Sequence, residues 1–226
     1  MRRVVEPELM VEAGQVRAYA DADFEAAHAG IMAECFARFP ALPPGALVAD
    51  LGCGAGDIAV RLTKRYPNCQ VHAFDGSQPM LDCAARATAQ AGVAERVHLQ
   101  QAVLPDLGAL GRRCGGQYAM VASNSLLHHL HDPSVLWRTV RALAAPKARV
   151  FIADLRRPDD AARARAMVEQ YAAGEPEVLR RDFHNSLRAA FAVDEVRAQL
   201  RAENLNLEVA PLGDRHMTIH GVLAGA

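Results

Sequence analysis

A glycine-rich turn directly after an apolar run constrains the fold of this chain more than any other feature of its sequence. Residues 46–51 form a short apolar run bounded by turn residues, which predicts a buried β-strand. Gly52, Gly54 and Gly56 then let the backbone turn sharply and let a ligand approach the main chain. The helix predicted at residues 57–66 has free N–H groups in its first turn. The segment therefore predicts a strand–turn–helix unit that binds a nucleotide-like ligand.

Strand and helix patterns alternate after this turn as far as residue 154. Further strands are predicted at residues 69–75, 96–102, 118–123 and 148–154. Further helices are predicted at residues 77–91 and 132–144. Such alternation indicates a parallel sheet with helices on both faces and a ligand site at the carboxyl ends of the strands.

The end of the chain predicts two more strands, at residues 205–211 and 215–223, joined by a hairpin turn at Gly213. The predicted fold class is therefore α/β, with a doubly wound, seven-stranded, mostly parallel sheet whose last strand is antiparallel. Two helical segments flank the alternating region, residues 8–39 before the first strand and residues 155–192 after the fifth. The second of these is strongly charged and has no strand pattern, which indicates a helical insertion.

The length of 226 residues fits one domain. We expect a single domain over residues 1–226, with an N-terminal helical cap (1–45), a cofactor-binding core (46–154), a helical insertion or lid (155–192) and a terminal helix with a strand hairpin (193–226). Helical segments at both ends of the ligand site predict an enclosed pocket.

Composition excludes several classes of protein. The net charge of -1 opposes a dedicated nucleic-acid binder, which carries a basic excess. The five cysteines are odd in number and none forms a C-x-x-C pair, so we predict neither a disulfide framework nor a metal site. Free thiols indicate a reducing compartment. We see no signal-peptide pattern and no apolar stretch of bilayer length, and we expect a cytoplasmic protein without a membrane partner.

The spacing of the acidic residues separates two kinds of nucleotide site. The dinucleotide fingerprint G-x-G-x-x-G requires a third glycine where this chain has Asp57. The charges of Asp50 and Asp57 would repel a pyrophosphate and tolerate a ligand with ammonium and sulfonium groups. Asp75 ends the next predicted strand and can accept hydrogen bonds from both ribose hydroxyls, at roughly 1.5–3 kcal/mol each. Its alternative role is a helix cap beside Ser77, but the glycine turn one strand earlier favours ribose binding.

Three motifs, at residues 50–56, 75–80 and 124–129, together resemble those of the class I (nucleotide-fold) S-adenosylmethionine-dependent methyltransferases. The resemblance covers residues 46–154. It implies S-adenosyl-L-methionine as the cofactor and a seven-stranded sheet with an antiparallel last strand. None of the three motifs specifies an acceptor.

The resemblance also implies a role for each motif. The glycine turn packs on the methionine part of the cofactor, Asp75 holds the ribose, Met80 lies against the adenine, and Asn124 lies near the methionine carboxylate or the sulfonium. Tyr19 either closes over the cofactor from the N-terminal cap or packs on the core with Phe24. The expected cofactor-binding residues are Tyr19, Asp50, Gly52, Cys53, Gly54, Asp75, Gly76, Ser77, Met80, Gln101, Ala102, Val103 and Asn124.

One position departs from the family pattern. Many members carry an Asp after the third strand that bonds the adenine amino group, and this chain has Gln101 at that position. The amide of Gln101 can still accept a hydrogen bond, but it lacks the charge. The departure weakens the expected adenine contact and leaves the expected fold unchanged.

The expected catalytic residues follow the fourth and fifth strands. His128 and His129 lie after the fourth strand, where acceptors bind in this family, and histidine titrates in the useful range. A hydroxyl, thiol or protonated amine acceptor needs a base, whereas a free amine or a carboxylate does not. Asp154 ends the fifth strand, where a site role is favoured. The alternatives are a packing or capping histidine, and an Asp154 that pairs with Arg156.

The expected substrate-binding residues come from the insertion and the terminal hairpin. Phe183 and Asn185 form a lid wall or, alternatively, belong to an exposed charged helix. Arg215 and His216 lie at the hairpin, where Arg215 could hold an acceptor carboxylate in a bidentate pair. The alternative is a surface pair between Arg215 and Asp214.

The leading hypothesis is methyl transfer to a small-molecule acceptor by in-line displacement, aided by proximity in an enclosed pocket. An RNA or protein methyltransferase is a second reading, supported by arginine pairs at residues 112–113, 156–157 and 180–181. A nicotinamide-dependent oxidoreductase and a non-catalytic cofactor-binding protein are the other two. A nucleic-acid partner is not expected, and the chain is predicted to be a monomer or a homodimer.

Overall fold

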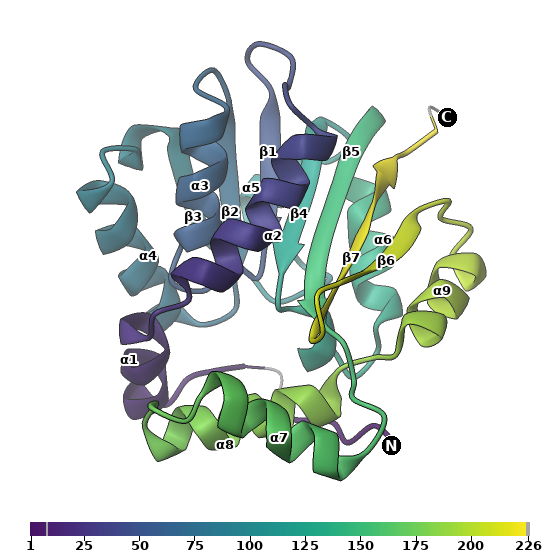
Figure 1. The fold of residues 1–226 in the computed structure, drawn as a ribbon. Helices are drawn as coiled ribbons and strands as arrows, with labels where there is room; N and C mark the ends of the chain where they lie inside the picture. The colour runs from purple at the N-terminus through teal and green to yellow at the C-terminus, as the bar shows by residue number, and fades with distance from the viewer. Residues whose placement is uncertain (8, 225–226) are drawn as a thin grey trace.

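The computed structural model describes residues 1–7 and 9–224, in which one seven-stranded sheet forms the centre of the molecule (Figure 1). The strands are β1 Leu47–Leu51, β2 Gln70–Asp75, β3 Val97–Gln101, β4 Tyr118–Asn124, β5 Ala144–Leu155, β6 Glu208–Leu212 and β7 His216–Val222. Their order across the sheet is β3-β2-β1-β4-β5-β7-β6. Strands β1 to β5 pair in parallel, and β7 is antiparallel to both β5 and β6. The predicted fold class is confirmed, including the antiparallel last strand.

Helices cover both faces of the sheet, because neighbouring strand residues point to opposite sides. Val48 packs in an apolar cluster with α2 Glu25–Arg38, α3 Asp57–Arg65 and α4 Gln78–Gln90. Ala49 packs in a second cluster with α5 Gly108–Cys114, α6 Ser134–Leu143 and α9 Val193–Ala202. Both strand residues are fully buried, as the central strands of a covered sheet require. Within residues 1–7 and 9–224, no helix combines the length and the apolarity that crossing a bilayer needs.

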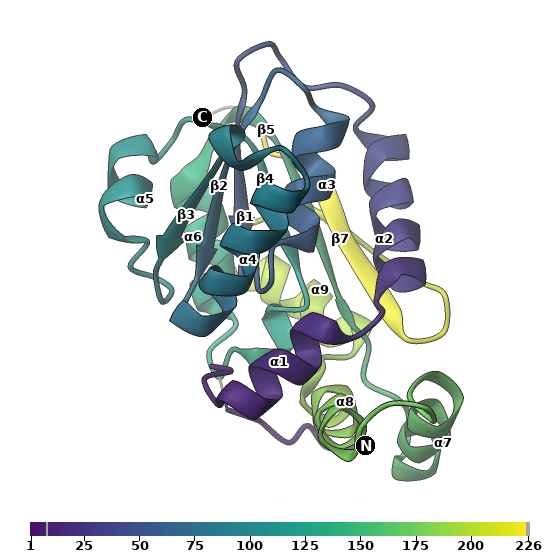
Figure 2. The same ribbon diagram turned by 90° about the vertical axis from the view of Figure 1, so that its left-hand side faces the viewer.

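Three further helices lie across the carboxyl ends of the parallel strands, at the bottom of Figure 1. They are α1 Ala13–Asp21, α7 Ala161–Tyr171 and α8 Glu177–Ala189, and we call them the helical roof. Helix α8 contacts both α1 and α7. The residues before α1 pass below α1 in Figure 2 and lie between α8 and the residues after β4, since the Val4 N–H donates to the Arg188 carbonyl and Arg3 donates to the carbonyls of His128 and Leu130. We call residues 1–7 and 9–12 the N-terminal strap.

The structure differs from the predicted elements at three places. The helical segment expected at 8–39 consists of two helices, because Ala22 is extended and Asp23 Oδ1 accepts the N–H of Glu25, which starts a new helix. Helix α5 was not predicted, since its short glycine-containing sequence has little apolar pattern. Strand β5 begins four residues earlier than predicted, although Pro146 lies within it and its pairing with β4 shifts register there.

Candidate cofactor and acceptor site

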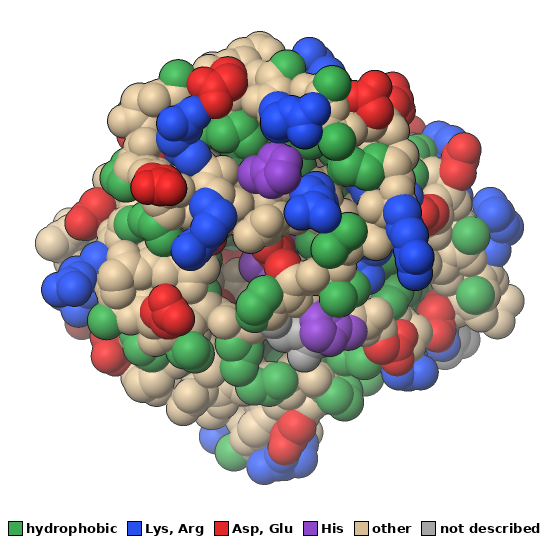
Figure 3. Space-filling model, turned by 90° about the horizontal axis from the view of Figure 1, so that it is seen from below, with side chains coloured by type: hydrophobic (Ala, Val, Ile, Leu, Met, Phe, Trp, Pro, Cys, Tyr) green, Lys and Arg blue, Asp and Glu red, His purple; other side chains and the backbone are tan. Residues whose placement is uncertain are grey.

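A cavity of about 880 Å³ lies between the carboxyl ends of the strands and the helical roof. Figure 3 shows the molecule from the roof side, where a hollow opens near the centre with acidic and histidine side chains inside it. The walls come from the strap, α1, α2, the ends of β1, β2 and β4, and the turn between β6 and β7. Most of the residues expected to bind cofactor or acceptor contribute to this one cavity.

The glycine turn after β1 forms one end of the cavity. Gly52 and Gly54 line it, and both have positive φ, at +68° and +52°. A side chain at Gly54 would meet nothing within 4 Å, so the main chain there is open to a ligand. Gly56 has a different reason to be glycine, because a Cβ atom would lie 2.9 Å from Ala84 of α4. The turn thus combines close helix packing with an exposed backbone.

Asp75, at the end of β2, lines the cavity beside this turn. Its Oδ2 accepts the N–H of Gly54 at 2.8 Å, and its Oδ1 accepts the N–H of Ser77 at 2.8 Å. Burial raises the pKa of Asp75, while these two backbone donors oppose that shift. Ser77 itself caps α4, since its Oγ accepts the N–H of Met80 at 3.4 Å. Asp75 therefore holds two turns together and still faces the ligand space.

Two buried oxygen-bearing groups near this end are left without hydrogen-bond partners. Both carboxylate oxygens of Asp50 and the amide oxygen of Asn124 are buried and unpartnered. Burial raises the pKa of Asp50 to about 7, and the nearby carboxylates of Asp75 and Asp57 add to the shift. A buried acceptor without a donor is costly, so these atoms favour a ligand that supplies N–H groups.

His28 of α2 is a site residue that the sequence interpretation missed. It lines the cavity, and its Nε2 lies 3.5 Å from the Asn124 amide nitrogen. Its Nδ1 lies 2.8 Å from Asp57 Oδ2, which also accepts from Arg61 at 2.7 Å. The charge of Asp57 is thus balanced by Arg61, and Asp57 does not line the cavity. A histidine inside a helix carries no sequence pattern that predicts contacts with residues so far away along the chain.

Aromatic side chains connect α1 and α2 along the same wall. The rings of Tyr19 and Phe24 lie 4.8 Å apart, and those of Phe24 and His28 lie 5.4 Å apart. All three residues line the cavity. Burial raises the pKa of Tyr19 to about 12, so the phenol stays protonated as a hydrogen-bond donor. The two alternatives for Tyr19 therefore coexist, since it packs against Phe24 and faces the ligand space.

The far end of this wall consists of Gly76, Met80, Ala102 and Val103. Leu9 of the strap covers it, and a Cβ atom on Gly76 would lie 2.5 Å from the Leu9 side chain.

The structure does not bring every expected cofactor residue to the cavity wall. Gln101 is exposed, and its amide nitrogen donates to the Gly76 carbonyl at 3.1 Å, so its side chain is turned away from the adenine contact expected of it. Gln101 is the last residue of the edge strand β3, where it pairs with Asp75 of β2. This position at the edge of the sheet leaves its side chain exposed. Asp50, Cys53 and Ser77 also lie behind the wall.

The acceptor end is organised around His128, which follows β4. Its Nδ1 lies 2.7 Å from Asp154 Oδ1, and Asp154 Oδ2 accepts the N–H of Leu127 at 2.8 Å. Asp154 is 1% exposed and lies behind the cavity wall, whereas His128 and His129 line the cavity. Burial lowers the pKa of His128, but the carboxylates of Asp154 and Glu6 outweigh this and raise it overall. Burial and His128 lower the pKa of His129 to about 3.

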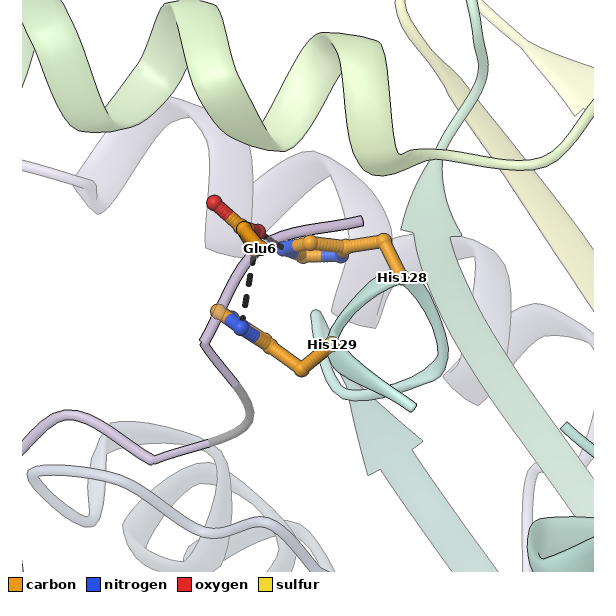
Figure 4. Close-up of side chains that lie close together, drawn as sticks. All are labelled: Glu6, His128 and His129. Atoms are coloured by element: carbon orange, nitrogen blue, oxygen red, sulfur yellow. Dashed lines mark ion pairs between the residues drawn. The ribbon is translucent and has the colours of Figure 1, made fainter. Parts of the chain in front are cut away.

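Glu6 of the strap completes this cluster, and the sequence interpretation missed it (Figure 4). Its Oε1 lies 3.5 Å from His128 Nε2 and 3.4 Å from His129 Nδ1. It also accepts from Ser186 Oγ of α8 at 3.0 Å. Arg3 anchors the strap by donating to the carbonyls of Ala189, His128 and Leu130. No local motif surrounds Glu6, so only the fold brings it here.

The four expected substrate-binding residues all line the cavity: Phe183, Asn185, Arg215 and His216. The expected alternative pair of Arg215 with Asp214 is wrong. The Asp214 carboxylate accepts instead from the Tyr171 hydroxyl at 2.8 Å and from Arg163 at 3.1 Å. The Arg215 guanidinium stacks 3.5 Å from the centre of the Tyr171 ring. Burial lowers the pKa of His216 to about 4.

Known proteins resemble this chain most clearly in its core. Residues 48–147 match the family model described as a methyltransferase domain. An uncharacterized protein of Synechococcus sp. is 33% identical over 114 residues, which cover 50% of this chain and 25% of that protein. The ubiquinone biosynthesis O-methyltransferase of Xanthomonas axonopodis pv. citri is 28% identical over 115 residues, which cover 51% of this chain and 45% of that protein. The chain thus spans less than half the length of either relative.

A solved structure extends the likeness to the whole fold. The crystal structure of a SAM-dependent methyltransferase from Aquifex aeolicus has a TM-score of 0.70 at 16% identity, over 95% of this chain and 100% of that one. Residues 48–147 therefore match a methyltransferase domain, and the described residues share the fold of a structure named as a SAM-dependent methyltransferase.

Proposed function

We propose that this chain transfers the methyl group of S-adenosyl-L-methionine to a small-molecule acceptor inside the cavity. The observation that carries the proposal is that the expected cofactor-binding residues and the expected acceptor-side residues line the same cavity. The glycine turn, Asp75 and Asn124 line the cavity at the ends of β1, β2 and β4, and His128, His129 and Arg215 line it from the segment after β4 and from the turn before β7. Such an arrangement would align donor and acceptor for in-line displacement.

The residues at the cofactor end fit S-adenosylmethionine. The unpartnered oxygen of Asn124, on the cavity wall, would accept from its ammonium group, and the buried carboxylate of Asp50 behind that wall would favour the positive charge. Each Asp75 oxygen has one backbone donor and keeps a lone pair for a ribose hydroxyl. Tyr19, Met80, Ala102 and Val103 offer apolar surface for the adenine. The cofactor supplies an electrophilic methyl group on a positively charged sulfur.

His128 is suited to receive a proton from the acceptor. Asp154 holds its Nδ1, so the nitrogen that can take up a proton is Nε2, which lies 3.5 Å from Glu6 Oε1, and a carboxylate–histidine pair of this kind acts as a base in other enzymes. We therefore assign Asp154 as a positioning residue and His128 as the proton acceptor. The helical roof and the strap would exclude water during transfer.

Three observations support a small acceptor over RNA or protein. The roof encloses the cavity, and its volume suits a cofactor with a small molecule beside it. The net charge of -1 gives no general attraction for nucleic acid. The name of one relative, a ubiquinone biosynthesis O-methyltransferase, supports an oxygen as the methylated atom.

Calorimetry followed by an activity screen tests the proposal. We expect saturable binding of S-adenosylhomocysteine and none of NADH. Cofactor with a labelled methyl group is then incubated with pools of small phenols and carboxylic acids, with total RNA and with a peptide library. Label in a small molecule supports the proposal. Label in RNA or peptide alone, or binding of NADH alone, contradicts it.

A further inference from the structure

Three donor atoms from two distant parts of the chain converge in the cluster of Glu6, His128 and His129 (Figure 4). One oxygen of Glu6 lies 3.5 Å from His128 Nε2 and 3.4 Å from His129 Nδ1. The three ligand atoms all lie within 4.8 Å of one another. Tetrahedral zinc with bonds of about 2.0–2.1 Å to nitrogen and oxygen has ligand atoms about 3.3–3.4 Å apart. Two of the three separations therefore already match a tetrahedral metal centre.

Neighbouring side chains hold the cluster residues in place, as the outer partners of metal ligands do. A histidine that binds a metal almost always donates its other ring nitrogen to a carboxylate or carbonyl, which fixes the ring. His128 does this with Asp154, at 2.7 Å. Glu6 is held in turn by Ser186, at 3.0 Å. The cluster thus has outer partners that set the orientation of two of its three members.

The position of the cluster leaves room for a further ligand. All three residues line the cavity, on the side where the acceptor is placed by the proposed function. Three protein ligands with one open position are the pattern of catalytic zinc sites, whereas structural sites are closed by four. Imidazole and carboxylate donors suit zinc and its first-row neighbours better than magnesium or calcium, which prefer oxygen ligands alone.

We propose that Glu6, His128 and His129 bind a first-row divalent metal ion of the zinc type, with an open position that takes an oxygen atom of the acceptor. The acceptor clause rests on the proposed function, but metal binding itself does not. A bound ion would occupy His128 Nε2, the same nitrogen that takes up the acceptor proton in the metal-free site. With the metal present, the acceptor oxygen would coordinate the ion, and His128 would not act as the base. This inference departs from the prediction of no metal site, because Glu6 lies 122 residues before His128 in the sequence.

Titration of the chelator-treated full chain tests the site directly. Zn²⁺ is titrated against a chromophoric chelator, and Co²⁺ is followed by its visible absorption. We expect one equivalent of each metal to bind and Co²⁺ to give tetrahedral bands. Glu6→Gln should weaken Zn²⁺ binding by at least about 10-fold, a loss that even an outer partner of a metal ligand causes. Glu12→Gln is the matched control, since Glu12 lies on the same strap and cavity but outside the cluster.

Two further measurements separate the possible failures. Azide added to the Co²⁺ protein should shift the absorption bands if a coordination position is open, and unchanged bands would overturn the open position. Equal Zn²⁺ binding by Glu6→Gln and by the unaltered chain, or no stoichiometric binding at all, would overturn the site. S-adenosylhomocysteine binding is measured on the same samples. A chain that binds it but not Zn²⁺ loses only this inference, whereas the reverse result removes the proposed function and leaves the metal site.

Discussion

The two ends of the cavity are built in opposite ways. The cofactor end comes from consecutive strand ends, where the turns after β1 and β2 are joined by Asp75. It keeps buried oxygen atoms of Asp50 and Asn124 without partners. The acceptor end gathers the strap, the residues after β4, helix α8 and the turn before β7. There, His128 already pairs with both Asp154 and Glu6.

The difference indicates that the cofactor end is incomplete without a ligand, whereas the acceptor end is stabilised by contacts within the protein. Unpartnered acceptors at the cofactor end cost stability until donors arrive, so ligand binding there should be strong. The acceptor end is stabilised by contacts across more than 100 residues of sequence, such as Arg3 with His128. Substitutions at the first end should therefore reduce cofactor affinity, and substitutions at the second should reduce stability or turnover.

The largest effect is expected for Asp154→Ala. The substitution leaves His128 Nδ1 and the N–H of Leu127 buried without an acceptor. Breaking a buried charged pair costs about 3–5 kcal/mol, so the free energy of unfolding should fall by that amount in urea denaturation. Asp159→Ala, at an exposed side chain nearby, is the control and should change it by less than about 0.5 kcal/mol. Equal effects of the two variants would contradict the anchoring role of Asp154.

The next effect concerns the cofactor end. Asp75→Ala removes the proposed acceptor of both ribose hydroxyls, and two hydrogen bonds to a charged group contribute about 1.5–3 kcal/mol each. The affinity for S-adenosylhomocysteine should fall at least about 100-fold, as measured by calorimetry. The matched control is Asp82→Ala on the exposed surface of α4, where the carboxylate accepts from Gln78. Unchanged affinity in the Asp75 variant would show that the ribose binds elsewhere.

The same contrast explains how far the sequence could predict the molecule. The cofactor end follows from short motifs, because a glycine turn and the acidic residue after the next strand lie at neighbouring strand ends in any parallel sheet of this kind. The predicted sheet and its antiparallel last strand are therefore confirmed. Glu6 and His28 were missed, because each reaches its partner across a distance in sequence that no local pattern encodes.

Gln101 shows the limit within the motif region itself. Its position in the sequence pointed to the adenine, but its side chain bonds the Gly76 carbonyl outside the cavity wall. Which face a residue at a strand end takes depends on the exact end of the pairing, and sequence patterns locate strand ends only within a few residues. Arg215 is similar, since its partner Tyr171 lies in the insertion and not in the hairpin.

A smaller effect is expected where the strap is fastened. Arg3→Ala removes three hydrogen bonds to carbonyl groups and a contact 4.0 Å from the centre of the Phe191 ring. We expect kcat/KM for methyl transfer to fall about 30-fold, equivalent to about 2 kcal/mol, because the cavity closes less often. Cofactor affinity should stay unchanged, since no cofactor residue touches Arg3. Arg2→Ala, at the exposed neighbouring residue, should have no effect, and equal losses in both variants would contradict the anchoring role.

The smallest effect is a dependence of cofactor affinity on pH. Burial raises the pKa of Asp50 to about 7 from 3.8, so the folded chain without ligand holds a proton that the unfolded chain releases at lower pH. Its stability therefore falls as pH rises from 3.8 to about 7. An ammonium group beside Asp50 favours the carboxylate, so cofactor binding should release a proton.

Affinity for S-adenosylhomocysteine should then rise about tenfold between pH 6 and pH 8, as the ionised fraction of a group with a pKa of about 7 does. Calorimetry in buffers of different ionisation enthalpy measures the proton released. Asp50→Asn serves as the matched control, because it keeps the shape of the side chain and cannot ionise. The variant should bind more weakly at pH 8, lose the pH dependence, and melt at a higher temperature than the unaltered chain at pH 8 without ligand. The same pH dependence in both proteins would mean that a group other than Asp50 titrates. The unpartnered carboxylate would then not account for the difference between the cofactor end and the acceptor end.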